Sequence, residues 1–421
     1  METLPYLRRK SDADLLQEPA IFSRKNGNVS STTMQTTSAL HSSSPFEAPL
    51  KAALDQVRSL RAEFPLGFPH GWTQGNRYLA RDLYGFAPGS NVGWTTGFWT
   101  GLLWLTYELS GDPECKESAS RHVTSFASRI QNRINVDHHD MGFLYTPSCV
   151  AAWKLTDNAQ AREAALDAAD CLMQRYWPKA GIIQAWGDLT DPEQRGRIII
   201  DCLLNLPLLF WASAATGNVA YLDAARSHLL KSRDHLVRPD ASSFHTFHFD
   251  VTTGAPVRGS TAQGAADDSC WSRGQAWGVY GFALNHRFAP HLGLLDVARR
   301  QADYFLDRVP SNGVVCWDLA YGDSTDEPWD SSASAIAVCG LLELASHLPE
   351  AQASRYRLAA LRILAGLTQH CNGAGTGSNA LLLHGVYSKP HGKGVDEASL
   401  WGDYFYLEAL ARATRGWRGH W

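Results

Sequence analysis

The sequence lacks a basic excess, and it lacks any long apolar run. Among its 421 residues, 38 Lys and Arg stand against 42 Asp and Glu, which gives a formal net charge of −4. A nucleic-acid-binding protein needs a basic stripe to follow the phosphates, and a membrane-spanning helix needs about 20 consecutive apolar residues. We therefore expect neither nucleic acid nor a membrane as a partner. An anionic ligand must instead meet a few local cations.

Paired cysteine motifs and a secretion signal are also missing. Eight cysteines are scattered along the chain, and none forms a Cys-x-x-Cys pair. The basic start Arg8-Arg-Lys10 is followed by an acidic, polar segment instead of the apolar core of a signal peptide. We therefore expect reduced, buried cysteines in a cytoplasmic protein. The glycosylation motif Asn28-Val-Ser30 carries little meaning in that setting.

The first 45 residues differ in composition from the rest of the chain. They are rich in Ser, Thr and Asn and show no periodicity, which predicts a disordered tail over residues 1–45. Residues 46–421 are expected to form a single catalytic domain. Hydrophobic periodicity predicts twelve helices in this domain, with approximate spans 46–62, 95–110, 114–132, 143–155, 159–176, 202–216, 219–236, 274–288, 293–308, 331–346, 350–370 and 397–414.

These helices alternate in character. The even-numbered ones are almost wholly apolar, as in residues 203–212, whereas the odd-numbered ones are amphipathic, as in residues 159–168. A helix that is apolar all round is buried, and one with a charged face lies outside. Short joints such as residues 109–113 make neighbouring helices antiparallel. The pattern predicts an all-α fold, an (α/α)6 barrel of six inner and six outer helices, with the long polar loops where the inner helices begin.

Two aspartates stand where predicted inner helices begin. Asp201 interrupts the apolar run that starts at Ile198, and Asp140 follows His138 and His139 at the corresponding place one helical pair earlier. Burial raises the pKa of a carboxyl group and lets it act as an acid near neutral pH. Two carboxyls on neighbouring inner helices could flank one sugar ring. Either aspartate could instead be a helix N-cap.

Arg273 is the one cation at the start of its predicted inner helix. An arginine in that position can bind a substrate carboxylate bidentately. His245 and Gln263 lie in the long preceding loop and could assist. The alternative for Arg273 is a structural ion pair with Asp267 or Asp268.

Two histidine clusters could suggest a metal site. One is the segment from His138 to Asp140, and the other is the pair His245 and His248. Neither has the spacing of an established site, and the second has no obvious third ligand. We therefore expect no metal and no cofactor.

Tryptophans accompany the polar clusters. The chain has 15, and Trp94, Trp186 and Trp277 either open inner helices or lie in the loops before them. Flat aromatic faces stack on sugar rings, although each of these side chains could instead be core packing. Asp330, which precedes a run of small residues, is interpreted chiefly as an N-cap, and Asp403 could be structural or functional. Together the clusters indicate a sugar-binding pocket.

The ordered set of clusters resembles the unsaturated glucuronyl hydrolases, family 88 of the glycoside hydrolases. The resemblance covers about residues 70–410. It implies the same (α/α)6 barrel, no metal and an intracellular location. The matching stretches are Val92-Gly-Trp-Thr-Thr-Gly-Phe-Trp-Thr-Gly101, His139-Asp-Met-Gly-Phe143, Gln184-Ala-Trp-Gly-Asp188, Arg197-Ile-Ile-Ile-Asp-Cys-Leu-Leu-Asn-Leu-Pro207, Ser272-Arg-Gly-Gln-Ala-Trp-Gly278, Asp330-Ser-Ser-Ala-Ser-Ala335 and Gly402-Asp-Tyr-Phe-Tyr406.

The resemblance also implies roles for individual residues. Asp201 matches the catalytic acid/base, and Asp140 matches the second essential aspartate. The residues that match contacts to an unsaturated uronic acid are His139, His245, Gln263 and Arg273, and those that match its aromatic wall are Trp94, Trp186 and Trp277.

The implied reaction is hydration of the C4=C5 double bond that polysaccharide lyases leave on a terminal uronic acid. Asp201 would protonate C4, water would add at C5, and the ring would open to release a keto acid and the shortened sugar. Three alternatives stay open: an unsaturated rhamnogalacturonyl hydrolase, a sugar epimerase on the same barrel, and a non-catalytic sugar-binding barrel. Ser388, Lys389 and Lys393 in the last long loop could meet a sulfate, although a solvated loop is the commoner role of such residues.

Overall fold

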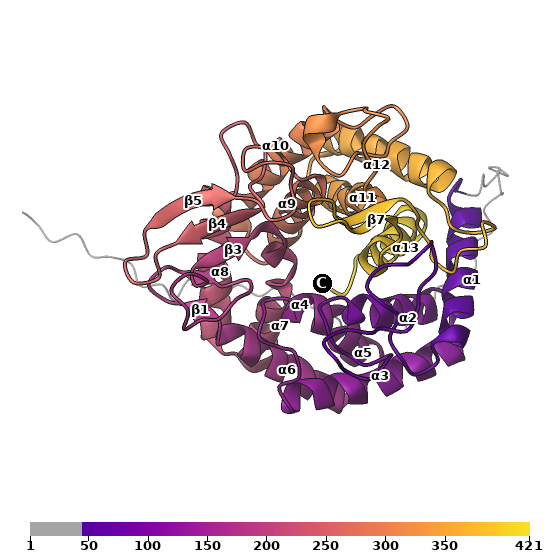
Figure 1. Ribbon diagram of the computed structural model, residues 1–421, viewed down its shortest axis with the longest axis horizontal. Helices are drawn as coiled ribbons and strands as arrows, with labels where there is room; N and C mark the ends of the chain where they lie inside the picture. Colours follow the sequence, from indigo (N-terminus) through magenta and orange to yellow (C-terminus); the bar gives the residue numbers. More distant parts are fainter. Residues whose placement is uncertain (1–43) are drawn as a thin grey trace, which may run out of the picture. The chain divides into compact units, whose positions relative to one another are not determined.

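Two concentric rings of helices make up the computed structural model over residues 44–421, the part of the chain that the structure describes (Figure 1). The inner ring consists of α2 (Thr96–Ser110), α4 (Met141–Tyr145) continued by η2 (Thr146–Val150) and α5 (Ala151–Thr156), η3 (Ile200–Leu204) followed by α7 (Pro207–Thr216), α9 (Ser272–Asn285), α11 (Ser331–Ser346) and α13 (Leu400–Arg415). The outer ring consists of α1 (Glu47–Glu63), α3 (Pro113–Gln131), α6 (Ala159–Met173), α8 (Val219–His235), α10 (Leu294–Leu306) and α12 (Glu350–His370). The prediction of an (α/α)6 barrel is confirmed.

Burial separates the two rings as their sequences predict. Every residue of the inner helix α9 is buried, whereas the outer helix α10 buries one stripe that includes Leu294, Ala298 and Phe305. An amphipathic helix packs its apolar stripe on the core and leaves its charged face in water. The ring closes where α13 packs against α2.

Capped joints of two residues make α2 and α7 antiparallel to the outer helices that follow them. Gly111 ends α2 in the left-handed conformation (φ 73°), and the side chain of Asp112 then accepts hydrogen bonds from the first turn of α3. Gly217 (φ 75°) and Asn218 repeat this arrangement between α7 and α8. Glycine adopts a positive φ without steric cost, and Asp or Asn satisfies the free N–H groups of the next helix.

Two inner helices are interrupted, which periodicity did not predict. The helix expected over 143–155 contains a π-helical turn that begins beside Pro147, and the helix expected over 202–216 is a 3-10 turn followed by an α-helix that begins at Pro207. Proline has no N–H to donate and clashes with the preceding turn, so it starts or breaks a helix. The carbonyl of Leu203, four residues before Pro207, accepts from the side chain of Asn285 instead (2.7 Å).

Seven short strands lie in the loops between helices, and none was predicted (Figure 1). They pair across long stretches of sequence; Arg197 lies opposite His248, for example. Their bounds are β1 (Tyr176–Trp177), β2 (Ile182–Ile183), β3 (Arg197–Ile199), β4 (Thr246–Phe249), β5 (Pro256–Ser260), β6 (Gly385–Ser388) and β7 (Lys393–Glu397), in antiparallel sheets ordered β1-β2, β3-β4-β5 and β6-β7. These sheets stiffen the long loops that precede the inner helices.

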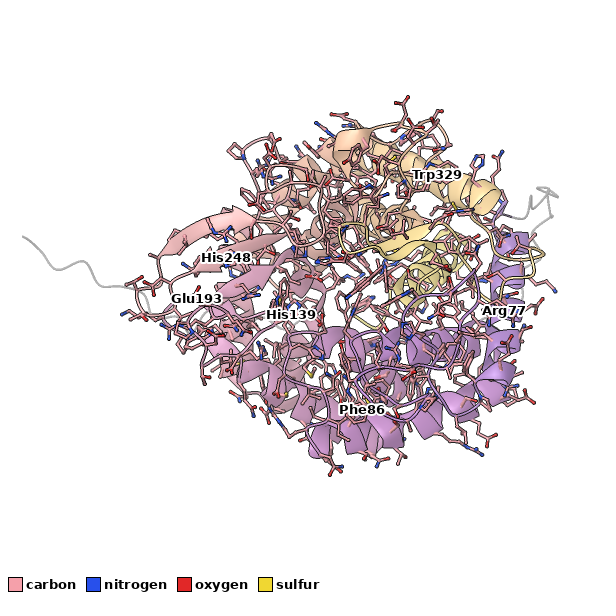
Figure 2. The ribbon with its side chains drawn as sticks, in the orientation of Figure 1. Arg77, Phe86, His139, Glu193, His248 and Trp329 are labelled. Carbon is pink, nitrogen blue, oxygen red and sulfur yellow. The ribbon has the colours of Figure 1, made fainter. Side chains whose placement is uncertain are left out.

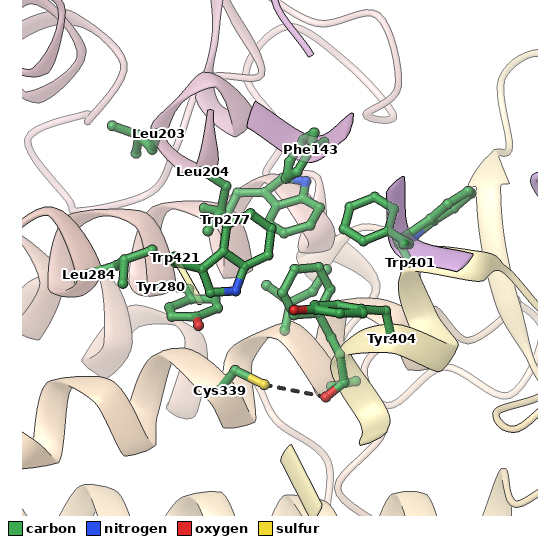
Figure 3. Close-up of a cluster of buried hydrophobic side chains, with 14 of the residues drawn as sticks. Phe143, Leu203, Leu204, Trp277, Tyr280, Leu284, Cys339, Trp401, Tyr404 and Trp421 are labelled. Atoms are coloured by element: carbon green, nitrogen blue, oxygen red, sulfur yellow. Dashed lines mark hydrogen bonds between the residues drawn. The ribbon is translucent and has the colours of Figure 1, made fainter. Parts of the chain in front are cut away.

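Aromatic side chains fill the middle of the inner ring (Figure 3). The ring of Trp421 stacks on Phe405 with 6.0 Å between centroids, and Phe143 packs edge-on against the same indole at 6.4 Å. Phe143 also contacts Trp277, at 5.2 Å between ring centroids. These rings form a packed aromatic layer inside the barrel, and Phe143 and Trp277 belong to it.

The expectations for the N-terminal tail, the cysteines and membrane spans concern different parts of the chain. Residues 1–43, which hold most of the predicted disordered tail and the Asn28 motif, lie outside the described residues. In the described part, all eight cysteines are buried free thiols. A search of the same residues finds no helix that combines the length and apolarity needed to cross a membrane.

Candidate active site

A cavity of about 200 Å³ opens where the inner helices begin, and it gathers nearly all of the predicted site residues. Trp94 precedes α2, His139 and Asp140 precede α4 (His139 is labelled in Figure 2), and Asp201 lies in η3. The residues that line the cavity are Trp94, His139, Asp140, Trp186, Ile199, Asp201, Gln263, Trp271, Arg273, Trp277 and Tyr387. Of the predicted site residues, His245 alone is not in this wall.

Asp201 is buried, and its carboxyl group has a free oxygen. Oδ1 has no hydrogen-bond partner within residues 44–421, and the side chain does not cap a helix. Burial raises the pKa of Asp201 to about 7; the His139 imidazolium opposes that rise and the Asp140 carboxylate adds to it. The N-cap alternative is therefore wrong for Asp201, and the carboxyl group keeps its proton up to the neutral pH range.

Asp140 has the opposite electrostatic state. Its carboxylate oxygens lie 3.0 Å from His138 Nδ1 and 3.3 Å from His139 Nε2. Burial alone would raise the pKa of Asp140, but the two imidazoles hold it well below its ordinary value. In return the carboxylate holds the pKa of His139 well above its ordinary value, although burial opposes this. Asp140 occupies the N-cap position of α4 without making a cap hydrogen bond, so its side chain serves the cavity.

The ionised and the protonated carboxyl lie close together. His139, Asp140 and Asp201 each offer one atom within 4.8 Å of the other two. Neighbouring carboxyls with pKa values pushed apart are the usual arrangement of an acid and a charge-stabilising partner. The same three residues could in principle hold a metal ion, but a histidine must lose its proton to become a ligand. The raised pKa of His139 therefore makes this donor set a poor fit to a metal.

Arg273 is completely buried in the wall and forms an ion pair with Asp330. Its Nη1 lies 2.7 Å from Asp330 Oδ2, so the alternative pairing with Asp267 or Asp268 is wrong. Asp330 stands at the N-cap position of α11, but its side chain makes no cap hydrogen bond. Its carboxylate instead accepts hydrogen bonds from Arg273 Nη1 and the Ser332 hydroxyl. The expectation of an N-cap is wrong for the side chain, because a buried guanidinium needs the carboxylate.

The Arg273 guanidinium also holds two other parts of the wall. Nη2 donates to Gln263 Oε1 at 2.8 Å and to the Tyr387 carbonyl at 2.6 Å, and Nη1 also donates to the carbonyl of Val386. The guanidinium lies over the ring of Trp271, 4.5 Å from its centroid. A direct bond from Nη2 to a ligand carboxylate therefore has to replace one of these bonds, and the one to the Gln263 side chain is the easiest to exchange.

The predicted aromatic wall forms, with unequal exposure. Trp94 is half-buried and stacks on Trp401 with 5.0 Å between ring centroids. Trp186 is half-buried beside His245, at 6.0 Å. Trp277 is 1% exposed and belongs mostly to the aromatic core. Trp94 and Trp186 thus offer faces to a ligand, and Trp277 forms the floor.

His245 lines a second cavity of about 230 Å³ that shares Trp186, Gln263 and Tyr387 with the first. Its Nδ1 contacts the Thr246 hydroxyl (2.6 Å), and its Nε2 has no partner in the described part of the chain. Burial lowers the pKa of His245 to about 3, so the ring is neutral. The other residues of this second cavity are Ala262, Ser388, His391 and Lys393.

Three wall residues were missed, and one uncertain residue proves structural. Trp271 directly precedes the Arg273 cluster and Ile199 lies within the stretch that contains Asp201, but neither was named as a site residue, whereas Tyr387 lies in no matching stretch. Asp403 lies outside the cavity, and its two carboxyl oxygens accept hydrogen bonds from the Tyr78 hydroxyl (3.0 Å) and the Leu382 N–H (2.9 Å). It joins two loops to α13.

Comparison with known proteins identifies the family. The sequence pattern of Glycosyl Hydrolase Family 88 matches residues 73–408. The chain is 51% identical over 334 residues to an unsaturated chondroitin disaccharide hydrolase of Streptococcus pneumoniae, covering 79% of this chain and 84% of that protein.

Solved structures agree in fold. The crystal structure of unsaturated glucuronyl hydrolase from Bacillus sp. GL1 superposes with a TM-score of 0.85 at 46% identity, covering 89% of this chain and 98% of that one. A variant of unsaturated glucuronyl hydrolase from Streptococcus agalactiae, complexed with dGlcA-GalNAc6S, superposes with a TM-score of 0.78 at 41% identity, covering 89% and 93%. The chain therefore belongs to glycosyl hydrolase family 88 and shares its unsaturated glucuronyl hydrolase activity on unsaturated oligosaccharides.

Proposed function

We propose that Asp201 is the general acid and base of this activity and that Asp140 stabilises the charge that develops. The observation that carries this assignment is the pair of carboxyls that offer atoms within 4.8 Å of each other: Asp201 has a free oxygen and a raised pKa, and Asp140 has a lowered pKa. A carboxyl whose pKa lies near the working pH is the most effective proton donor, and a positioned donor contributes about 10²–10⁴-fold to rate.

The steps follow from the vinyl ether of the substrate. Asp201 transfers its proton to C4, and the C4=C5 electron pair forms the new C–H bond. Positive charge then appears at C5, shared with the ring oxygen, where the Asp140 carboxylate stabilises it. Water adds to C5 and gives a proton to the Asp201 carboxylate, which restores the acid. The hemiketal opens to a 5-keto group, and the anomeric carbon then releases the remaining sugar as an alcohol.

Each of the two cavities binds one sugar of the substrate. The unsaturated uronic acid lies in the first cavity between Trp94 and Trp186, with the charge of Arg273 and the Gln263 side chain near its carboxylate. His245 Nδ1 accepts from the Ala262 N–H, so the free Nε2 of the neutral ring carries the hydrogen and donates to the substrate. The next sugar lies in the second cavity, which Ser388 and Lys393 line. The Streptococcus agalactiae variant was captured with dGlcA-GalNAc6S, so we propose unsaturated glycosaminoglycan disaccharides as substrates and Lys393 as the contact for a sulfate.

The test is Asp201→Asn, assayed with an unsaturated chondroitin disaccharide. The conjugated double bond absorbs in the ultraviolet, so its loss reports turnover, and calorimetry reports binding by the variant. We expect kcat to fall by about 10²–10⁴-fold with Kd within about threefold of the wild-type KM, because the amide keeps the shape and loses the proton. Near-normal kcat in this variant would reject the assignment. Mass spectrometry of the wild-type products separates the hydrolase, which yields a keto acid, from an epimerase, which does not.

We also propose a reducing compartment, the cytoplasm, as the site of action. The support is the set of eight buried free thiols, since secreted proteins tend to oxidise their cysteines. Thiol titration of the denatured protein, isolated under acid quench, should find all eight in the reduced form.

A further inference from the structure

Three buried arginines hydrogen-bond the loops that line the cavity, and none has a carboxylate partner in the described part of the chain. Arg81 and Arg129 are each 1% exposed, and Arg175 is 4% exposed. None forms an ion pair within residues 44–421, unlike Arg273 with Asp330. A buried charge normally carries an opposite charge beside it. The hydrogen bonds that these three guanidiniums donate must therefore compensate for their burial.

Arg129, in the last turn of the outer helix α3, joins two loops that enter neighbouring inner helices. One loop carries Trp94 and the other leads to Asp140. Its guanidinium donates to oxygens of both loops: the Gly93 carbonyl (2.9 Å), Asn91 Oδ1 (3.0 Å) and Thr96 Oγ1 (3.1 Å) in the first, and the Asn135 (2.7 Å) and Ile134 (3.2 Å) carbonyls in the second. The acceptors lie on both sides of Trp94. Arg81 adds bonds to Val92 and Thr95 of the same loop.

Arg175, just after the outer helix α6, joins the second of these loops to a third. Nη1 donates to the carbonyl of Asp137 at 3.0 Å, three residues before Asp140. Nε and Nη2 donate to the carbonyls of Gln184 and Gly187, each at 2.9 Å, which flank Trp186. One guanidinium therefore fixes the distance between the loop of the proposed charge-stabilising carboxylate and the loop of an aromatic wall.

Arginine suits this task better than any other side chain. Its planar group presents five N–H donors in a rigid fork and stays protonated, so one residue can hold carbonyls of two segments by charge-assisted bonds. Burial lowers the pKa of Arg81 to about 9 and that of Arg129 to about 10, and both groups remain charged at neutral pH. Lysine keeps the charge but is a point donor without the fork.

We infer that Arg129 and Arg175 are positioning residues that hold the Trp94, Asp140 and Trp186 loops in a fixed relative position. This inference rests on the proposed assignment of the site. It assigns function to residues of the outer ring that touch no substrate: Arg129 sets the place of Trp94, and Arg175 sets the places of Asp140 and Trp186 together.

The test compares Arg129→Lys and Arg175→Lys with wild type on the unsaturated disaccharide. We expect Arg129→Lys to raise KM about tenfold with a smaller change in kcat, because Trp94 contacts substrate. Arg175→Lys should change both constants and lower kcat/KM by about 10–100-fold, since small displacements of positioned groups cost up to about 10²-fold in rate. A merely structural role would lower the folded fraction, and hence apparent kcat, and leave KM unchanged.

Arg412→Lys is the matched control. Arg412 is also buried, but it pairs with Glu343 and Glu408 at the other end of the barrel. This variant should unfold at lower temperature and keep the wild-type KM. Folded Arg129→Lys and Arg175→Lys enzymes with both constants within twofold of wild type, or with unchanged KM, would overturn the inference. If Trp94→Ala and Asp140→Asn also left the kinetics unchanged, the site assignment itself would have failed.

Discussion

The two ends of the barrel differ in how completely their buried charged groups are paired. At the far end, where the inner helices finish, Arg412 lies 3.0 Å from Glu343 and 2.8 Å from Glu408, and Arg287 and His347 complete the partners of Glu343. At the cavity end Arg273 pairs with Asp330, but within residues 44–421 Asp201 Oδ1 has no hydrogen-bond donor and three buried arginines have no carboxylate partner.

The pKa values record the same difference. Burial raises the pKa of Asp201 to about 7, whereas His347, Arg412 and Arg287 overcome burial and hold the pKa of Glu343 at about 2. Both carboxyls are buried, so burial alone does not decide their state. The ion pairs at the far end keep Glu343 charged, whereas Asp201 at the cavity end can release and take up a proton near neutral pH.

After Asp201→Asn, neutralising Asp140 is expected to give the next largest effect at the cavity end. In Asp140→Asn the amide keeps the shape, but the negative charge that faces the developing charge at C5 is lost. We expect kcat to fall about 10²–10³-fold, the range for removal of one preorganised stabilising group, with KM within about threefold. Absorbance decay of the unsaturated disaccharide measures both constants. Retention of a third or more of wild-type kcat would make Asp140 a scaffold residue only.

Neutralising Glu343 should instead change stability and leave catalysis alone. Glu343→Gln leaves buried Arg412 with one carboxylate, and we expect the free energy of unfolding to fall by about 3 kcal/mol, measured in urea. The pKa of Glu343 is depressed in the folded state, so this contribution is present above about pH 4.5 and disappears as the pH falls toward 2.

The matched control is Glu350→Gln, which breaks an exposed pair with Arg357. It should leave the urea midpoint unchanged. Equal losses in the two variants would mean that the buried network adds nothing beyond a surface ion pair. A change in kcat of folded Glu343→Gln would contradict the separation of the two ends.

The pH profile should report the proton on Asp201. Since burial raises the pKa of this acid to about 7, its catalytic proton is present below pH 7 and is lost above it. We expect kcat/KM of the free enzyme to fall about tenfold per pH unit above roughly pH 7. Asp140 stays ionised across this range, because its pKa is lowered. A profile that is flat from pH 7 to pH 9 would contradict Asp201 as the acid.

The smallest effect is expected for Asp403, whose carboxyl group resembles Asp201 in one property only. Burial also raises the pKa of Asp403 to about 7, yet both of its oxygens have partners and it lies outside the cavity. In Asp403→Asn we expect kcat and KM within about threefold of wild type and a stability loss of about 1 kcal/mol. A catalytic loss like that of Asp201→Asn would show that location inside the cavity does not distinguish Asp201 from Asp403.

The sequence predicted the helices well because their signal is local. All twelve spans form, since the alternation of apolar and amphipathic helices and the turn residues between them are visible within a few positions. Proline accounts for the two interrupted helices, and Pro147 and Pro207 could have been given more weight. The strands were missed because their pairing depends on residues as distant as Arg197 and His248.

The sequence predicted which residues line the site better than it predicted the hydrogen bonds between them. The aspartates and tryptophans stand out at helix starts, and the fold brings them to one cavity. The ion pair of Arg273 with Asp330 was not anticipated because Asp330 lies 57 positions away, and the alternative considered for Arg273 named only the nearby Asp267 and Asp268. The arginines of the outer ring carry no motif at all. Their role becomes visible only when the acceptors of their hydrogen bonds are known.

Closure of the ring between α2 and α13 has a consequence for synthesis of the protein. About 300 residues separate the two helices, so the ribosome completes α13 roughly 15–60 s after α2 has emerged. The contact between Tyr78 and Asp403 spans 325 positions. During that interval the apolar residues of α2 that contact α13 have no final partner and are open to aggregation. We therefore expect the nascent barrel to be a chaperone client until its last helix docks.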